Sequence, residues 1–212
     1  AEISSGKILL SGQNLLSLNA KDLRDIRGHS ISMIFQDPMT ALNPVLSIGE
    51  QMVETFLRHT DLKRKEALQK SVDLLSRVEI PSPKEKLKYY PHQLSGGMRQ
   101  RVMIAMSLAC SPRLLIADEP TTALDVLTQA QILELLESLK KETGMSILII
   151  THDLGVVAEI AQRVLIMYAG EIVESGPARA LLDNPLHPYT KGLIASVPKL
   201  GALKKLGARL DE

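Results

Sequence analysis

In LLIADEPTTALD, Leu114 to Asp125, four aliphatic residues run directly into the adjacent acids Asp118 and Glu119. Two interpretations fit this stretch. In the first, a strand simply finishes in solvent, because strands often end in Asp, Pro or Thr. In the second, a buried strand carries two carboxylates to a site for metal and phosphate, since Mg²⁺ prefers carboxylate oxygen. The rest of the sequence must decide between them.

Composition favours a globular protein of ordinary charge. The chain has 212 residues, of which 45% are hydrophobic, enough to supply a core. Its 25 basic and 24 acidic residues nearly cancel, and only 3% of residues are aromatic, so neither an overall basic field nor base stacking favours nucleic acid. The single cysteine, Cys110, lies in an apolar run, where we expect a reduced core thiol in a cytoplasmic protein. We expect neither a membrane span nor a signal peptide.

Strands and helices alternate along the chain. We expect strands over 7–12, 29–37, 113–118 and 146–153, a hairpin over 163–176 turning near Gly170, and helices over 20–28, 94–110, 128–144, 177–184 and 189–197. The order strand, helix, strand between 113 and 153 predicts a parallel pair.

A block from Ser47 to Lys88 has helical periodicity. We expect one apolar face of Ile48, Met52, Val53, Phe56 and Leu57, and another of Leu68, Val72, Leu75 and Val78. Prolines then force the chain to turn before the helix that starts near Leu94. The sequence therefore predicts a helical insertion between two strands of the sheet.

Polar residues follow two of the predicted parallel strands. Asp118 and Glu119 end one strand and His152 lies at the end of the other. Such sheets bind ligands at the carboxyl ends of their strands. There Asp118 could meet Mg²⁺, Glu119 could polarise a water, and His152 could donate to a developing phosphate charge. Each residue alone fits a solvated strand end equally well, but the combination favours a site.

A third element is LSGGMRQR, Leu94 to Arg101. Two glycines ahead of a helix let backbone N–H groups approach an anion, and the helix N-terminus adds about half a positive charge. Ser95 could cap the helix or bind a phosphate. In isolation, a Ser-Gly-Gly loop that only caps a helix is the better interpretation. The two acids elsewhere in the chain favour the phosphate site.

With these elements in view, the chain resembles the nucleotide-binding subunits of ABC transporters. LSGGMRQR is similar to the signature motif, LLIADE to the Walker B strand, ALD (Ala123 to Asp125) to the D-loop, THD to the switch-histidine motif and FQDP to the Q-loop. All five occur in the family's order. Longer stretches, including IFQDPMTALNPVLSIGEQ and NPLHPYTKGLIASVP, resemble the oligopeptide, dipeptide and nickel importer subfamily.

The resemblance implies an α/β fold, a P-loop NTPase-like ABC ATPase domain with a mainly parallel sheet and an inserted helical subdomain at about 40–108. It places a partial ATPase domain at 1–180 and the start of the subfamily's carboxyl-terminal extension at 181–212. It implies ATP and Mg²⁺ as ligands of the intact protein. The implied location is the cytoplasmic face of the cell membrane, bound peripherally.

Roles follow from the same resemblance. Asp118 would hold Mg²⁺ through water, and Glu119 would be the general base. His152 would contact the γ-phosphate. Gln36 would contact the metal and the attacking water, and it would also couple to the membrane partner. The γ-phosphate on a second ATPase subunit would be held by Ser95, Gly96, Gly97 and Gln100. Asp125 would communicate across that dimer.

The implied partners are this second ATPase subunit, identical or different, two transmembrane permease subunits on which the helical block would dock, and, indirectly, an extracytoplasmic solute-binding protein. No nucleic acid is implied. The protein would energise uptake of dipeptides, oligopeptides or nickel.

The chain departs from the family in one respect. The family's phosphate cradle, G-x-x-x-x-G-K-[ST], is not among its residues, and its Gly6-Lys7 pair is followed by Ile8. We therefore expect an amino-terminally truncated protein that lacks the first strands, stops before the subfamily's usual tail, and as given binds ATP weakly or not at all and does not hydrolyse it. We also expect the missing strand to lie beside the Walker B strand, so that its absence exposes apolar surface and unpaired backbone groups.

Two alternatives come from other functional classes. A DNA-repair or chromosome ATPase would share the signature and Walker B motifs, but it would carry long coiled coils or zinc-binding cysteines between them, which this sequence lacks. A non-catalytic module would dock on membrane subunits without hydrolysing ATP. A pull-down with the membrane partners beside an ATPase assay separates this module from an enzyme.

Overall fold

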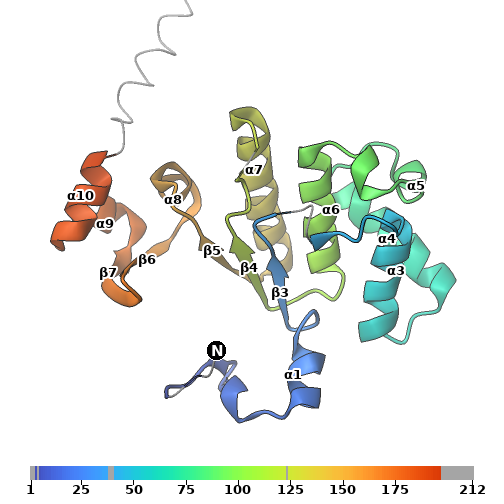
Figure 1. Cartoon of the computed structure of the whole chain (residues 1–212), viewed down its shortest axis with the longest axis horizontal. Helices are drawn as coiled ribbons and strands as arrows, with labels where there is room; N and C mark the ends of the chain where they lie inside the picture. Colours follow the sequence, from blue (N-terminus) through green and yellow to red (C-terminus); the bar gives the residue numbers. More distant parts are fainter. Residues whose placement is uncertain (1–2, 4, 38–40, 123, 197–212) are drawn as a thin grey trace, which may run out of the picture. The chain divides into compact units, whose positions relative to one another are not determined.

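The computed structural model describes residue 3 and residues 5–37, 41–122 and 124–196 (Figure 1). The chain divides into two compact units, residues 1–150 and 151–212. Each unit is described by itself. The predicted sequence boundary between 180 and 181 remains a prediction.

The first unit opens with small elements. β1 (Leu9–Leu10) pairs antiparallel with β2 (Gln13–Asn14), and a 3₁₀ turn, η1 (Leu15–Ser17), follows. The predicted buried strand over 7–12 is therefore wrong, since β1 has two residues and Leu9 is exposed. α1 (Ala20–Ile26) confirms the next prediction and starts at Asn19, whose side chain accepts two backbone N–H bonds.

A parallel three-stranded sheet forms the centre of the first unit. β3 (Ile31–Ile34), β4 (Leu114–Asp118) and β5 (Ser146–Ile150) pair in the order β3-β4-β5. α7 (Val126–Thr143) connects β4 with β5 and ends at Gly144, which has a φ of +70°, so the predicted strand-helix-strand unit is confirmed. Both sides of β4 are paired, so the expectation that a missing strand lies beside β4 is wrong.

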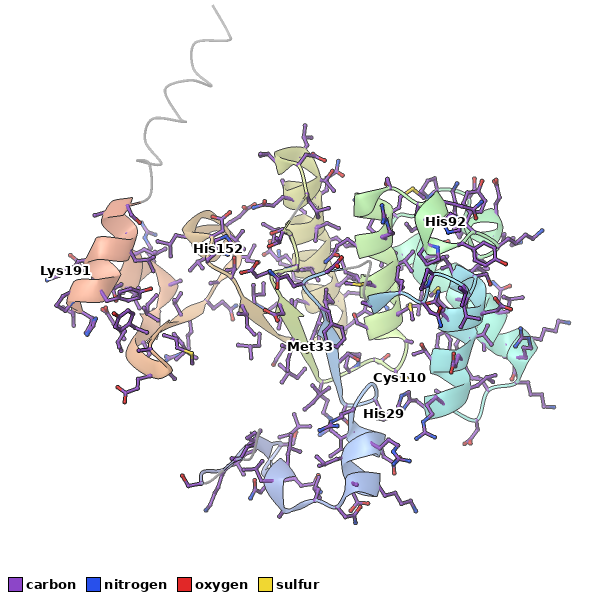
Figure 2. All side chains as sticks on the ribbon, in the orientation of Figure 1. His29, Met33, His92, Cys110, His152 and Lys191 are labelled. Atoms are coloured by element: carbon purple, nitrogen blue, oxygen red, sulfur yellow. The ribbon has the colours of Figure 1, made fainter. Side chains whose placement is uncertain are left out.

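The two faces of this sheet differ in burial. Ile34, Leu115 and Ala117 are buried in a core shared with α6 (Gly96–Leu108) and α7. On the opposite face Met33 is 38% exposed, Leu148 44% and Ile150 47%; Met33 is labelled in Figure 2. Parallel sheets usually bury both faces. One face of the sheet therefore carries exposed apolar side chains, and the expectation that a missing strand exposes them stays a prediction.

The predicted helical block is confirmed. It contains α3 (Ile48–His59), α4 (Arg64–Arg77) and α5 (Pro83–Lys86). A 3₁₀ turn, η2 (Pro91–Gln93), then leads to α6. A capping box of Ser47 and Glu50 starts α3. Leu57 and Leu68 were predicted on apolar faces and are exposed instead.

The helical block and the sheet share one core. A single cluster of buried side chains runs from Ile34 on β3 through Ile104 on α6 to Met52 and Leu75 on α3 and α4. Cys110 follows α6 and is only half-buried, so its predicted place in the core is wrong. Partial burial raises the pKa of the Cys110 thiol.

The second unit begins with α8 (Leu154–Ile160), a helix that was not predicted from the sequence. The predicted hairpin follows as β6 (Arg163–Tyr168) and β7 (Glu171–Pro177). The two predicted C-terminal helices are α9 (Ala178–Asp183) and α10 (Pro188–Ser196). The hairpin turns through Ala169 and Gly170, both with positive φ. The Glu174 carboxylate accepts the N–H groups of Leu186 and His187 just ahead of α10. Across the parts of the chain that the structure describes, no helix is both long and apolar enough to span a bilayer.

Candidate functional site

Glu119 lies immediately after β4 in an unusual backbone conformation. Its φ is +46°, a left-handed value that costs a residue with a side chain about 1–3 kcal/mol and persists only when its surroundings hold it. Two backbone hydrogen bonds provide this support: Glu119 N–H donates to the Ile150 carbonyl at 2.8 Å, and the Glu119 carbonyl accepts from Thr122 N–H at 3.1 Å. The end of β4 is therefore fixed to the end of β5.

The Glu119 carboxylate is held by two side chains. Its Oε2 accepts from Gln36 Nε2 at 2.9 Å and from Thr122 Oγ1 at 2.8 Å. Gln36 comes from the loop after β3, 83 positions earlier in the chain. The structure therefore brings together two of the predicted catalytic residues. Thr122 was missed at the sequence level, where only its position in the Asp-Glu-Pro-Thr-Thr run could have indicated it.

The predicted metal ligands Asp118 and Gln36 come from the carboxyl ends of the paired strands β4 and β3. Asp118 is the last residue of β4 and is in register with Ile150, and Glu119 follows it. Because Gln36 donates through its nitrogen, its amide oxygen is left to accept. No group of three or more His, Cys, Asp or Glu suited to a metal occurs among the residues described. Mg²⁺ nevertheless fits this oxygen set, since it is usually bound by one or two carboxylates, waters and substrate phosphates.

The signature motif forms the start of α6. Ser95 is the N-cap, and its Oγ accepts from Met98 N–H at 3.3 Å. Gly96 and Gly97 are the first two helical residues, so the glycines belong to the helix and do not precede it as predicted. A Cβ on Gly97 would lie 2.7 Å from Thr128 Cγ2 at the start of α7. Gly97 is thus required by packing, and its backbone N–H belongs to the positive end of α6.

Gln100 and Asp125 have partners within the chain. Gln100 is 2% exposed and its Nε2 donates to the Pro120 carbonyl at 2.6 Å. Asp125 is the N-cap of α7 and accepts from Thr128 N–H at 2.9 Å and Thr128 Oγ1 at 2.7 Å, and these bonds hold the pKa of its carboxyl below the usual value. Their predicted roles toward a second subunit remain predictions. Ala123 of the D-loop lies outside the described residues.

His152 follows β5 by two residues and belongs to the second unit (Figure 2). Next to it, Thr151 Oγ1 accepts from Asp153 N–H at 3.0 Å, and the Asp153 side chain caps α8. The predicted contact of His152 with a γ-phosphate remains a prediction.

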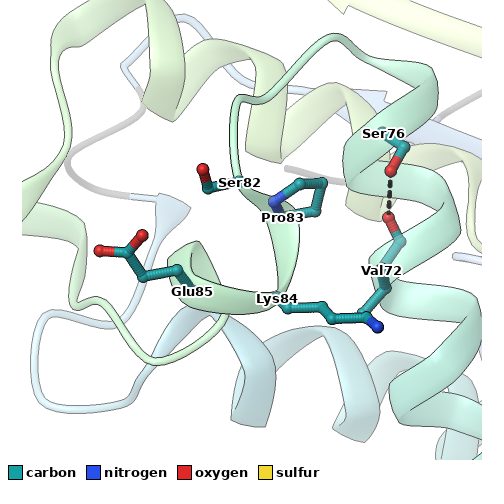
Figure 3. A pocket seen from close by; sticks show the side chains of 6 residues that line it. All are labelled: Val72, Ser76, Ser82, Pro83, Lys84 and Glu85. Carbon is teal, nitrogen blue, oxygen red and sulfur yellow. Dashed lines mark hydrogen bonds between the residues drawn. The ribbon is translucent and has the colours of Figure 1, made fainter.

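Two of the hollows formed by the described residues lie in the first unit. One, of about 380 Å³, lies between α4 and α5 and is lined by Val72, Ser76, Ser82, Pro83, Lys84 and Glu85 (Figure 3). None of the predicted site residues lines it. The other, of about 760 Å³, lies along α3 and includes Glu50, Glu54, Arg58 and Arg64 as well as Asn43 from the loop after Gln36.

A family model described as ABC transporter matches residues 1–122, more than half of the chain. The chain belongs to the ABC transporter family. A second model, described as oligopeptide/dipeptide transporter, C-terminal region, matches residues 173–211.

Similar curated proteins are peptide-transport subunits by name. The dipeptide transport ATP-binding protein DppD of Bacillus subtilis is 56% identical over 94% of this chain and 60% of its own length. The oligopeptide transport ATP-binding protein AppD of the same organism is 54% identical over 98% of this chain and 63% of its own length. The chain thus spans about three fifths of the length of these relatives.

Among solved structures, the ATP-binding cassette MJ0796 in a dimeric post-hydrolysis state bound to ADP and Pi has a TM-score of 0.73 at 29% identity, over 83% of this chain and 75% of that one. This similarity confirms the predicted ABC ATPase fold. Gln36 and Glu119, which the structure joins by a hydrogen bond, therefore lie in the chain of an ABC ATPase, a family that binds nucleotides.

Proposed function

We propose that this chain provides the Walker B, Q-loop and signature parts of an ATPase subunit that powers import of dipeptides or oligopeptides. The observation that carries the proposal is the Glu119 carboxylate, held by Gln36 and Thr122 beside Asp118. The names of the similar proteins and the match to the peptide-transporter C-terminal region support the peptide as the transported solute.

Glu119 acts as the general base in this proposal. A base must lie within hydrogen-bond reach of the water that it activates, and phosphoryl transfer depends mainly on positioning and electrostatics. The bonds from Gln36 and Thr122 orient the carboxylate, and Glu119 takes the proton of the water that attacks the γ-phosphate. Asp118 and the Gln36 amide oxygen would hold Mg²⁺, which would supply positive charge to the phosphates when bound.

The signature end of α6 serves a second ATPase subunit. The backbone N–H groups of Gly96 and Gly97 and the Ser95 hydroxyl form the positive end of a 13-residue helix, which suits an anion. In the proposed dimer they hold the partner's γ-phosphate, Asp125 lies at the dimer contact, and His152 binds the γ-phosphate of its own site. The dimeric state of MJ0796 supports this arrangement.

The hollow along α3 serves the membrane partners. Its mixed lining of Glu50, Glu54, Arg58 and Arg64 and its position next to the loop that follows Gln36 suit a polar helix of a transmembrane subunit. Two such subunits would hold the ATPase at the cytoplasmic face of the membrane, and a solute-binding protein would contact them from the other side. A non-catalytic module that only docks on the membrane subunits would use the same hollow, and Glu119 would then have no catalytic role.

The test is Mg²⁺-dependent ATP hydrolysis and peptide uptake by the transporter assembled in vesicles from ATPase subunits that contain this chain together with the phosphate cradle G-x-x-x-x-G-K-[ST], with and without Glu119→Gln. We expect the variant to lose nearly all hydrolysis and uptake while it still assembles, because an amide cannot accept the proton of water. Glu171→Gln in the exposed hairpin turn is the matched control and should behave as the unaltered protein. Uptake that survives Glu119→Gln would favour the non-catalytic docking module.

A further inference from the structure

Gln100 connects the signature helix to the turn that carries Glu119. It lies on α6, five residues after Ser95, and is 2% exposed. Its Nε2 donates to the carbonyl of Pro120, the residue directly after Glu119, at 2.6 Å. Resting on the proposed function, we infer that Gln100 is a positioning residue that ties α6 to the general base of the same chain.

The hydrogen bond from Gln100 to Pro120 lies next to the left-handed residue Glu119. Glu119 has a left-handed φ of +46°, and the bond from its N–H to Ile150 fixes only the peptide on its N-terminal side. The Glu119–Pro120 peptide has no N–H and is held through the Glu119 carbonyl, which accepts from Thr122 N–H at 3.1 Å. The Pro120 carbonyl belongs to the next peptide of the same turn and needs a donor of its own. Gln100 supplies the donor from a buried position, where a hydrogen bond is strengthened by the low local dielectric.

The link joins two halves of the proposed catalytic cycle. Ser95, Gly96 and Gly97 lie on the first turn of α6, and Gln100 lies on the second turn of the same helix. A helix moves as a rigid element, so a shift of α6 when its first turn meets an anion is passed to the Pro120 carbonyl and hence to Glu119. Occupation of the signature end therefore alters how well the base in the same chain is aligned.

The test compares Gln100→Met, Gln100→Glu and the unaltered protein in the assembled transporter, with kcat and KM for ATP measured well below the thermal midpoint of each. Gln100→Met keeps the length of the side chain and removes the donor. We expect its kcat to fall about tenfold with KM unchanged, as for the loss of alignment only. Gln69→Met, on the exposed side of α4, is the control and should leave kcat unchanged.

Gln100→Glu tests the pH dependence of kcat, which would not change if Gln100 had a purely structural role. An ionised Glu at this position only accepts hydrogen bonds and repels the Pro120 carbonyl, whereas a protonated Glu donates to it. We expect the ratio of the variant's kcat to that of the unaltered protein to rise as the pH is lowered. This variant also serves if Gln100→Met fails to fold.

Each outcome decides the inference. A folded Gln100→Met with unaltered kcat, or a Gln100→Glu ratio that does not change with pH, would overturn the positioning role alone, provided that hydrolysis still requires Glu119. Absence of hydrolysis in the unaltered transporter, or full activity of Glu119→Gln, would refute the proposed function and this inference with it.

Discussion

Replacing Gly97 by alanine should destabilise the protein, although alanine is the better helix former. The added Cβ would lie 2.7 Å from Thr128 Cγ2, well inside ordinary contact distance. The methyl group cannot rotate away freely, because Thr128 Oγ1 donates to Asp125 Oδ2 at 2.7 Å and this bond fixes the side chain. Either the bond must break or α6 must move away from α7.

The expected cost follows from these two opposing effects. Overpacking of a well-packed contact costs about 1–3 kcal/mol. Against this, Gly→Ala within a helix gains up to about 1 kcal/mol. We therefore expect Gly97→Ala to lower the free energy of unfolding by about 1–2 kcal/mol. Gly96→Ala is the matched control, because its Cβ would lie at an ordinary 3.8 Å from Leu124, and it should be neutral or slightly stabilising.

Urea denaturation of the purified variants measures the difference in the free energy of unfolding. The dependence of this free energy on urea concentration, the m value, should be the same for all variants. The double variant Gly97→Ala with Thr128→Ser removes the opposing methyl group while keeping the hydroxyl that bonds Asp125, so it should recover most of the loss. The reasoning is refuted if Gly97→Ala is as stable as Gly96→Ala, or if Thr128→Ser gives no recovery.

Two further changes test the packing of the helical block. Arg101→Met removes the bonds that the buried guanidinium donates to the Val78 carbonyl at 2.9 Å and to Glu79 at 2.8 Å, and it should cost about 2–3 kcal/mol in urea denaturation; a loss no larger than that of Glu79→Gln would contradict this. Burial, together with the nearby charges of Arg58 and His29, holds the pKa of His59 below its ordinary value of 6.5, so protonation opposes folding. The stability contribution of neutral His59 is complete above that ordinary value and is lost as the pH falls below it, and His59→Gln should flatten this decline in unfolding free energy between neutral and mildly acidic pH.

The order of elements in the sheet region could be predicted because the sequence signals there are local. Aliphatic runs, the apolar period of 128–144 and the terminating Gly144 all act within a few residues, and the structure confirms them as β4, α7 and β5. The predicted strand over 7–12 failed because a short apolar run does not form a buried strand without partners. Only two of its residues pair, with β2.

Periodicity indicates a helix face but not its width. The predicted faces of α3 and α4 contain the buried Ile48, Met52 and Leu75, whereas Leu57 and Leu68 lie at the margins and are exposed. The half-buried Cys110 reflects a similar limit, since its apolar run continues past the end of α6.

In the candidate site, the hydrogen bonds between residues distant in the sequence could not be predicted from the sequence. The sequence motifs predicted Gln36 and Glu119 separately, but their hydrogen bond spans 83 positions and depends on the pairing of β3 with β4. The roles of Thr122 and of the Gln100 bond to Pro120 were not predicted, because no sequence pattern shows which carbonyl a buried amide meets. Gln100 was predicted to hold the γ-phosphate on a second subunit, which stays a prediction, and the structure gives its amide a partner in its own chain.

The most direct test of the central claim is a double-mutant cycle on kcat for Mg²⁺-dependent ATP hydrolysis by the assembled transporter, with Gln36→Ala, Glu119→Gln and both changes together. If Gln36 orients the Glu119 carboxylate in addition to holding Mg²⁺, each single change lowers kcat, and Gln36→Ala lowers kcat by a smaller factor once Glu119 is an amide than it does in the unaltered protein. Two effects that simply multiply would show that the hydrogen bond between Gln36 and Glu119 has no part in hydrolysis.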